Sequence, residues 1–242
     1  MVELLQLGLC VKYFPESSFY VVISFVAVII IGYLLGSLNF GVIISTAFYH
    51  DDIRKHGSGS AGMTNMLRTY GKIPAALTFL GDGLKTVAAV FIGALFLGHH
   101  YTYAGSYIGG IACMIGHAYP VYYKFKGGKG VTAAFFMVLC TNPLVALICL
   151  IIFIIIVAGT KYISLGSIMS ILIYPLILNR LTGVGLHNLI AILAALFVVY
   201  LHRANIQRLM SGTENKLNLK SKKNKKSEKS EKKKKSNGEE ST

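Results

Sequence analysis

Long apolar runs separated by short polar segments dominate this chain. The runs cover Phe19–Phe48, Ile73–Leu97, a stretch that ends near Tyr119, Val131–Thr160, Tyr162–Leu178 and His187–Leu201. About 20 consecutive apolar residues form a helix long enough to cross the ~30 Å hydrocarbon core of a membrane. Because the apolar residues come in runs of about this length, the pattern predicts an all-α, polytopic membrane protein rather than a soluble domain.

Lysine and arginine in the short loops predict how the helices are oriented, because these residues gather in cytoplasmic loops. They occupy the loop His50–Lys72, the loop Tyr122–Gly130, position 161 and the C-terminal tail. The turn His99–Tyr101 has neither Lys nor Arg, and Asn179–Leu186 has only Arg180. We therefore expect the N-terminus outside the cell and the C-terminus in the cytoplasm.

The run Val131–Thr160 does not fit a single crossing. Both of its flanks are expected on the cytoplasmic side, so the chain between them must leave and return. It has too few residues for two spans of ~20 each, and Asn142-Pro143 marks a break because Pro ends helices. Val131–Thr141 would form a helix only about 16 Å long. We expect a short or re-entrant helix beside a cavity, because broken backbone at membrane depth must be buried or line water. About seven membrane helices result, one or more of them short or broken.

Charge narrows the choice of ligand. The formal net charge is +14, and mean hydropathy is +0.59 over 242 residues. Only Asp51, Asp52 and Asp82 are acidic within residues 19–210. A membrane region this basic and this poor in carboxylates favours anionic ligands such as phosphate over cations. We expect no metal site and no cofactor, and nucleic acid is not among the expected partners.

The same distribution divides the chain into an N-terminal extension (1–18), a membrane domain (19–210) and a Lys-rich cytoplasmic tail (211–242). The tail has no apolar residue after Leu219 and should be disordered. It is either simply solvated or attracted to anionic lipid. The single cysteines, none of which forms a CxxC pair, are interpreted as small buried apolar residues.

The segment Asp52–Lys72 is the most informative polar loop. Gly57, Gly59 and Gly62 match the letters of a dinucleotide fingerprint, but that motif needs a preceding strand, and the flanks here are membrane helices. Glycines still let several backbone N–H groups converge on one anion. Candidate phosphate donors around them are Ser58, Ser60, Thr64, Asn65, Arg54 and Arg68. A flexible polar loop without a ligand is the alternative.

Two further segments carry candidate chemistry. Lys126 and Lys129 flank Gly127-Gly128 just before a helix expected to start near Val131, and a helix N-terminus beside lysine is suited to anions. A simple topology anchor is the alternative. His202 and Asn205 lie at i, i+3 and share a helix face at the same membrane boundary.

A few polar residues lie within the apolar runs. Ser37 and Ser164 lie near the inner membrane boundary, where a lone hydroxyl more often bonds to backbone than to a ligand. Asp82 and Lys85, at i, i+3, are expected to pair with each other.

Taken together, the segments resemble one family, the bacterial integral-membrane acyl-phosphate:glycerol-3-phosphate acyltransferases. The matching segments are Gly36–Gly41, Asp52–Lys72, Asp82–Lys85, Gly116–Thr132, His202–Glu214 and, more weakly, Lys161–Ser164. The resemblance implies seven membrane helices in a bacterial plasma membrane and an active site on the cytoplasmic side. It implies transfer of a fatty acyl group from acyl phosphate to the 1-hydroxyl of glycerol 3-phosphate, giving lysophosphatidate and phosphate in the first acylation of phospholipid synthesis.

The resemblance also implies roles for individual residues. Glycerol 3-phosphate would be bound by Ser58, Arg68, Lys129, Ser164, His202 and Asn205. Acyl phosphate would be held by Gly59, Ser60, Gly62, Thr64, Asn65, Gly127 and Gly128. His202, Asn205 and Lys129 would act in catalysis, and Ser37, Arg54 and Lys126 would support them. Membrane lipid is a further partner, and an interaction with the enzyme that produces acyl phosphate is left open.

The sequence departs from the family pattern at a few positions. Ser60 stands where Asn is usual, Met63 where Ala is, Asn39 where Pro or Thr is common, and Ala204 where Glu is. Ser60 is the departure that bears on the acyl-phosphate ligands.

The expected reaction fits the residue types. Both substrates and the developing oxyanion are negative, so a pocket rich in Lys, Arg and N–H groups stabilises all three. Acyl phosphate is already activated, so no serine nucleophile or metal is needed. Either His202 or the substrate's own phosphate would take the hydroxyl proton. A transporter of organic phosphate and a phospholipid-binding structural protein are the alternatives, although no internal repeat of the transporter type is visible.

Overall fold

The computed structural model describes residues 18–97, 104–183 and 185–217, and every regular element within these ranges is helical. The α-helices are α2 (Ser18–Ser37), α3 (Phe40–Tyr49), α4 (Met63–Thr69), α5 (Lys72–Leu97), α6 (Ala104–Ala118), α7 (Val131–Thr141), α8 (Pro143–Thr160), α9 (Ile163–Thr182), α10 (Leu186–Leu201) and α11 (Arg203–Met210). Two 3₁₀ turns, η1 (Ile53–Lys55) and η3 (Val121–Tyr123), lie in the polar loops. The all-α prediction is confirmed. The predicted turn His99–Tyr101, residues 1–17 and the tail after Leu217 lie outside the described residues.

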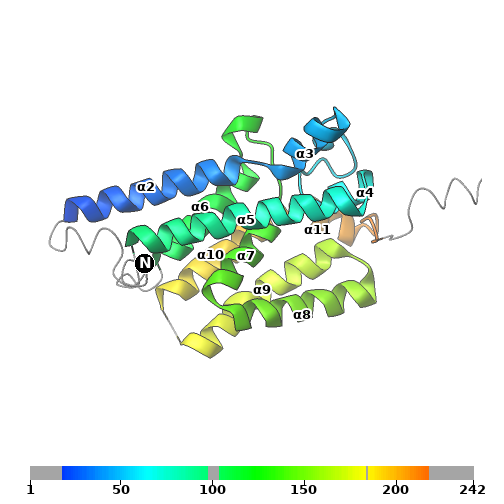
Figure 1. Ribbon diagram of the computed structural model, residues 1–242. Coiled ribbons are helices and arrows are strands. Elements are labelled where there is room, and N and C mark those ends of the chain that lie inside the picture. The colour runs from blue at the N-terminus through cyan, green and yellow to red at the C-terminus, as the bar shows by residue number, and fades with distance from the viewer. Residues whose placement is uncertain (1–17, 98–103, 184, 218–242) are drawn as a thin grey trace, which may run out of the picture.

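The helices form two groups with the short helix α7 between them. Figure 1 shows α2, α5 and α6 in one group and α8, α9 and α10 in the other. Helices α5 and α6 approach closely because glycines face each other: a Cβ at Gly93 would meet the backbone of Gly105, and a Cβ at Gly105 that of Gly93. Small residues allow such contact in membranes, where van der Waals packing holds helices together.

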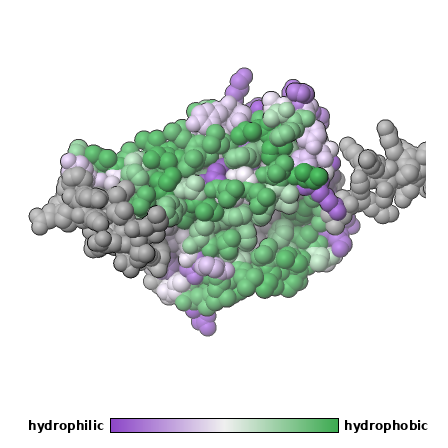
Figure 2. Space-filling view, viewed as in Figure 1, coloured by the Kyte–Doolittle hydropathy of each residue, from purple (hydrophilic) through white to green (hydrophobic). Residues whose placement is uncertain are grey.

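The main apolar core lies around α7. Met137 and Val138 of α7 pack with Tyr174 of α9 and with Ala191 and Ala194 of α10. Large apolar side chains cover the outer faces of the helices, while hydrophilic ones gather mainly at the end that carries α3, α4 and α11 (Figure 2). This distribution matches a protein whose middle is surrounded by lipid.

The break predicted within Val131–Thr160 is confirmed. Helix α7 ends at Thr141, Asn142 has φ −150° and ψ 80°, and Pro143 begins α8. Proline fits the first turn of a helix because its missing N–H would have no partner there. Helix α7 therefore stays short, as its composition indicated.

The first run, predicted as one span over Phe19–Phe48, forms one candidate span over Phe19–Tyr49, and its helix is interrupted within that span. The helix stops at Ser37 and resumes at Phe40, with Asn39 fully buried at the break. The Lys85 ammonium donates to the carbonyl oxygens of Gly36 and Leu38, at 2.9 and 2.6 Å. A lysine from another helix thus satisfies the backbone groups that the break exposes.

Four stretches among the described residues are long and apolar enough to cross a membrane: Phe19–Tyr49, Lys72–Leu97, Pro143–Thr160 and Ile163–Thr182. Helices α10 and α11 form a fifth when read together, bent by 60°. Helices α6 and α7 are shorter, so the total of seven crossings stays a prediction.

Candidate functional site

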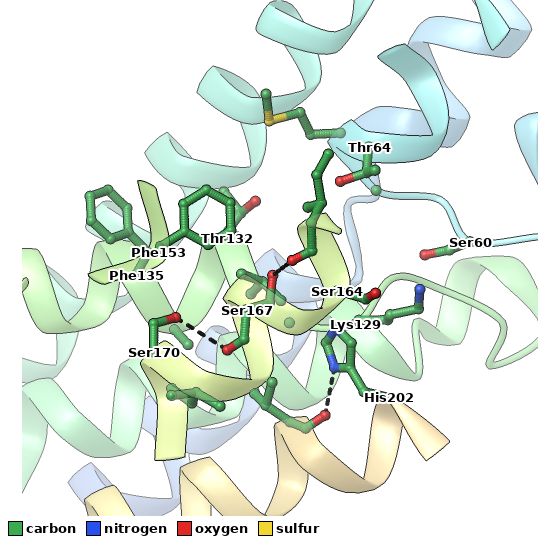
Figure 3. A pocket seen from close by; sticks show the side chains of 18 of the residues that line it. Ser60, Thr64, Lys129, Thr132, Phe135, Phe153, Ser164, Ser167, Ser170 and His202 are labelled. Atoms are coloured by element: carbon green, nitrogen blue, oxygen red, sulfur yellow. Dashed lines mark hydrogen bonds between the residues drawn. The ribbon is translucent and has the colours of Figure 1, made fainter. Parts of the chain in front are cut away.

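A cavity of about 460 Å³ extends from the polar loops into the membrane domain. Its polar part is lined by Ser58, Ser60, Gly62, Thr64, Arg68, Lys129, Ser164, His202, Asn205 and Glu214. Its apolar part includes Phe135, Val138, Ala146, Cys149, Phe153, Ile171 and Tyr174. Figure 3 shows Lys129, Ser164 and His202 beside one another, with Ser60 and Thr64 nearby and Phe135 and Phe153 on the opposite side. The cavity therefore joins a basic, hydroxyl-rich region to a hydrocarbon-like one.

The first polar loop is shaped by Asn65 at the start of α4. The Asn65 amide nitrogen donates to the carbonyl oxygens of Ile53, His56 and Ser60, at 3.1, 2.9 and 2.9 Å. Its amide oxygen accepts the N–H of Ser58 at 3.1 Å. Asn65 was predicted to hold acyl phosphate, but its side chain is fully engaged in folding the loop that presents Ser58 and Ser60.

The start of α4 faces the cavity. Gly62 precedes the helix, and Met63 and Thr64 occupy its first turn. The first N–H groups of a helix have no partner within it, and they attract anions. Ser60, Gly62 and Thr64 line the cavity beside these N–H groups, and their binding of acyl phosphate stays a prediction. Gly59 has φ +70°, a conformation that glycine adopts freely, and shapes the turn instead of lining the cavity.

Arg54 was expected to contact phosphate, and the structure gives it another role. Its guanidinium pairs with Asp52 at 2.7 Å and donates to the carbonyl oxygens of Tyr123 and Lys126, at 2.8 and 3.1 Å. Arg54 thus ties the first polar loop to the second. Lys126 does not line the cavity, but its carbonyl group takes part in this contact.

The glycine pair of the second loop packs against the end of α6. The N–H groups of Gly127 and Gly128 donate to the carbonyl oxygens of Ala118 and His117, at 3.1 and 3.0 Å. Both amides therefore have protein partners, and neither glycine lines the cavity. The predicted contact of Gly127 and Gly128 with acyl phosphate is not supported by this geometry. The pair instead permits a close approach that brings the next residue, Lys129, to the cavity.

Lys129 lies just before α7, whose N-cap residue is Gly130, with φ +76°. Burial, together with the nearby positive charges of Arg208 and Arg68 and against the opposing effect of Glu214, lowers the pKa of Lys129 to about 8. Burial likewise lowers the pKa of Arg68, whose guanidinium donates to the carbonyl oxygen of Asn215 at 3.0 Å. Crowded, partly desolvated cations of this kind bind an anion strongly.

His202 lies at the bend between α10 and α11. Its Nδ1 is 2.8 Å from the carbonyl oxygen of Val198. A carbonyl oxygen only accepts, so Nδ1 must carry a hydrogen. In the neutral ring the lone pair is then on Nε2, on the other side of the ring. His202 is therefore suited to accept a proton from a ligand in the cavity.

Glu214 is a site residue that the sequence did not reveal. Its carboxylate accepts from Ser164 Oγ and Asn205 Nδ2, both at 2.9 Å, and from Arg208 Nε at 2.7 Å. Burial would raise the pKa of Glu214, but these three hydrogen bonds hold it below its usual value. The carboxylate therefore brings together two predicted glycerol-phosphate ligands, Ser164 and Asn205, from α9 and α11.

Ser37 lies away from the cavity. Its hydroxyl donates to the carbonyl oxygen of Tyr33 at 2.9 Å and accepts the N–H of Val121 at 3.3 Å. Conversely, Thr132 and Ser170 line the cavity although nothing in the sequence singled them out. Ser167 also lines it, and its hydroxyl donates to the carbonyl oxygen of Ile163 at 3.0 Å, as expected of a lone serine in a membrane helix. All three hydroxyls lie in apolar helices, where only the packing shows which face meets the cavity.

Comparisons with known proteins agree with one another. The family model described as "Glycerol-3-phosphate acyltransferase" matches residues 26–212. A relative named glycerol-3-phosphate acyltransferase from Clostridioides difficile (strain 630) is 41% identical over 208 residues, covering 83% of this chain and 99% of the relative. Another from Finegoldia magna is 42% identical over 192 residues, covering 78% of this chain and 93% of the relative.

Solved structures show the same likeness. The crystal structure of PlsY (YgiH), described as an integral membrane glycerol 3-phosphate acyltransferase in its glycerol 3-phosphate form, matches with a TM-score of 0.73 and 33% identity. The match covers 81% of this chain and 96% of that chain. Its lysophosphatidic acid form matches with a TM-score of 0.71 and 32% identity.

Proposed function

The chain belongs to the glycerol-3-phosphate acyltransferase family, and on this premise we propose that it transfers a fatty acyl group from acyl phosphate to the 1-hydroxyl of glycerol 3-phosphate. The products are 1-acyl-glycerol 3-phosphate (lysophosphatidate) and inorganic phosphate. Family membership favours acyl transfer over the transport of organic phosphate. The observation that carries the proposal is a cavity that combines a basic region with an apolar region.

The basic region suits glycerol 3-phosphate. Lys129 and Arg68 supply positive charge, while Ser58 and the second amide hydrogen of Asn205 supply neutral donors. The Ser164 hydroxyl donates to Glu214, so its oxygen would accept a hydrogen bond from a hydroxyl group of glycerol 3-phosphate. Charge-assisted hydrogen bonds from such groups hold a phosphate more strongly than neutral ones do. The phosphate anchors the molecule, so its 1-hydroxyl is held near the acyl group and the reaction becomes effectively unimolecular.

The acyl donor fits the rest of the cavity. Ser60 and Thr64, with the first N–H groups of α4, would hold its phosphate, and the fatty chain would lie along Phe135, Phe153 and Tyr174. An acyl phosphate is a mixed anhydride with a good leaving group. The cavity therefore needs to position the donor and stabilise charge, without a covalent intermediate on the protein.

In the reaction, the 1-hydroxyl oxygen bonds to the acyl carbon, and the bond from that carbon to the phosphate oxygen breaks. The hydroxyl proton goes to Nε2 of His202 or to the phosphate of glycerol 3-phosphate. Positive charge from Lys129 stabilises the oxyanion and the departing phosphate. We place the site on the cytoplasmic side of a bacterial plasma membrane, with the N-terminus outside, because Lys and Arg are concentrated in the loops around it.

The donor is tested directly with purified protein. Palmitoyl phosphate and glycerol 3-phosphate should yield phosphate and 1-acyl-glycerol 3-phosphate, whereas palmitoyl-CoA and palmitoyl acyl carrier protein should give no turnover. The sequence has no H-x-x-x-x-D pair of the kind that the common acyltransferases use. Equal rates with palmitoyl-CoA would show that the donor is wrongly assigned.

A further inference from the structure

Asp82 and Lys85 of α5 and His117 of α6 form a buried polar cluster that the proposed reaction does not use. Asp82 Oδ1 is 2.7 Å from Lys85 Nζ and 3.5 Å from His117 Nδ1. All three residues are at most 5% exposed. Ionisable residues are rare within membrane helices and, when present, they are usually paired and tied to function.

The hydrogen bonds of Lys85 determine how His117 must be oriented. An ammonium group has three protons, and those of Lys85 go to the carbonyl oxygens of Gly36 and Leu38 and to Asp82. None remains for His117 Nδ1, although it lies 3.2 Å from Lys85 Nζ. Nδ1 must therefore carry its own hydrogen and direct it to Asp82. The ring is held by this contact, and its Nε2 edge points the other way.

That Nε2 edge lies against the second polar loop. A Cβ at Gly128 would collide with the His117 ring, Nε2 first. The His117 carbonyl oxygen also accepts the N–H of Gly128 at 3.0 Å. Gly128 is thus fixed by both the ring and the backbone of His117, and Lys129 is the next residue.

The first polar loop is attached to the same structure. The Gly127 carbonyl oxygen accepts the N–H of Ala61 at 3.4 Å. The Asn39 amide donates to the His117 carbonyl oxygen at 3.4 Å, and the N–H of Phe40 lies 3.5 Å from Asp82 Oδ1. The cluster therefore connects the break between α2 and α3 to both loops at the cavity.

We propose that His117, oriented by Asp82 and Lys85, is a positioning residue that fixes Lys129 for binding the phosphate of glycerol 3-phosphate. The inference rests on the proposed phosphate contact of Lys129. His117 also borders the cavity, but in this scheme it touches no reacting atom and acts through the loop. A loss of this support should therefore weaken glycerol 3-phosphate binding more than it slows the chemical step.

The test is a double-mutant cycle between His117 and Lys129, read as KM for glycerol 3-phosphate. In His117→Asn the shorter amide can still donate to Asp82 but no longer reaches Gly128. We expect its KM to rise about tenfold, with kcat changed less than threefold. In a Lys129→Ala background the same change should alter KM less than twofold, because residues that act together are not additive. Cys113→Ala, one turn earlier on α6 and equally buried, is the matched control and should leave KM unchanged.

A second variant does not depend on the folding of His117→Asn. Asp82→Asn combined with Lys85→Met removes the ion pair as a unit, so no charge is left buried without a partner. His117 then loses its orienting carboxylate, and KM should rise as in His117→Asn. An unchanged KM in either variant, or additive effects of His117→Asn and Lys129→Ala, would overturn the positioning role and leave the proposed reaction intact. An unchanged KM in Lys129→Ala alone would overturn the phosphate contact, and with it this inference.

Discussion

Lys129 combines burial with positive neighbours, and its charge should therefore depend on pH near the physiological range. The pKa of its ammonium is lowered to about 8. The charged form, which binds phosphate, is present below this pH and is lost above it. We expect kcat/KM for glycerol 3-phosphate to fall as pH rises through 8, since this ratio reports the free enzyme. In Lys129→Arg the guanidinium remains charged, so the decline in kcat/KM should move to higher pH. If the pH profile of this variant does not move, another group causes the decline.

The two polar loops contain several lysines, and only some of them should matter for catalysis. Lys129 lines the cavity, whereas Lys124 lies before the glycine pair and does not. Lys129→Ala removes a charge-assisted contact of ~1.5–3 kcal/mol, so we expect catalytic efficiency to fall at least tenfold. Lys124→Ala should be mild. Steady-state kinetics at matched folding distinguishes them, and equal damage would mean that the loop acts through its overall charge.

At position 68 we expect phosphate binding to require the arginine side chain itself and not only a positive charge. Its half-buried guanidinium borders the cavity, and a planar fork binds phosphate through two parallel hydrogen bonds that an ammonium cannot reproduce. Arg68→Lys should therefore also lower kcat/KM for glycerol 3-phosphate, at least several-fold. A variant with wild-type kinetics would show that Arg68 contributes only its charge.

At the scale of helices and loops, local sequence signals predicted some features and missed others for identifiable reasons. Pro143 predicted the break before α8, because proline has no backbone N–H and its ring disfavours a continuing helix. The break at Asn39 has no such local signal, since Lys85 and Asp82 from α5 stabilise it. The role of Glu214 was not predicted, because a single acidic residue near a basic tail forms no recognisable motif. It becomes a site residue only where α9 and α11 pack around it.

The glycine pair illustrates the same limit. Its composition predicted an anion site, whereas the structure packs both glycines against the end of α6. The glycines in the sequence indicate that a Cβ atom would not fit at these two positions. Only the fold shows which neighbouring atoms occupy the space. Likewise, Asn65 and Arg54 were recognised as strong donors, and their acceptors proved to be backbone carbonyls of the loops themselves.

Gly128→Ala tests this assignment of the loop. The added methyl group would collide with the His117 ring, which Asp82 holds in place, so the loop must shift. We expect kcat/KM to fall at least tenfold while the helices stay folded. Gly159→Ala, in α8 where the new methyl group meets open space, is the control and should be neutral or slightly stabilising. Circular dichroism with steady-state kinetics provides the measurement, and wild-type activity in Gly128→Ala would show that the close packing is not needed.

At the scale of the whole molecule, the cavity is built from segments far apart in the sequence. Its polar residues come from the first loop, the second loop, α9, α11 and the segment after it, while its apolar lining comes from α7, α8 and α9 (Figures 1 and 3). Hydropathy predicts that these helices are apolar all round and therefore cannot say which face meets a ligand. The family resemblance predicted residues for the polar part of the site. The apolar part, which is proposed to hold the acyl chain, could be identified only from how the helices pack.

The segment that follows α11 contributes both to the packing of the membrane domain and to the candidate site. Residues 211–217 fall within the predicted tail, yet Glu214 is buried against Ser164 and Asn205, and the N–H of Leu217 donates to the Lys161 carbonyl oxygen at 2.6 Å. Truncation after Leu217 keeps these contacts and removes only residues whose composition predicts no packing. We expect turnover in detergent to change less than tenfold, equivalent to ~1.4 kcal/mol in the barrier.

Truncation after Thr213 is the informative contrast, because it removes Glu214 with only three further residues, of which Asn215 and Lys216 are exposed. Ser164, Asn205 and Arg208 then lose their shared acceptor, and α11 loses its link to α9. Breaking a partly buried charged pair leaves the remaining cation without compensation, so turnover should fall at least a hundredfold and the melting temperature should drop. Phosphate release and thermal unfolding are measured on both truncations. Similar activity in the two proteins would show that Glu214 is dispensable and that the site ends with α11.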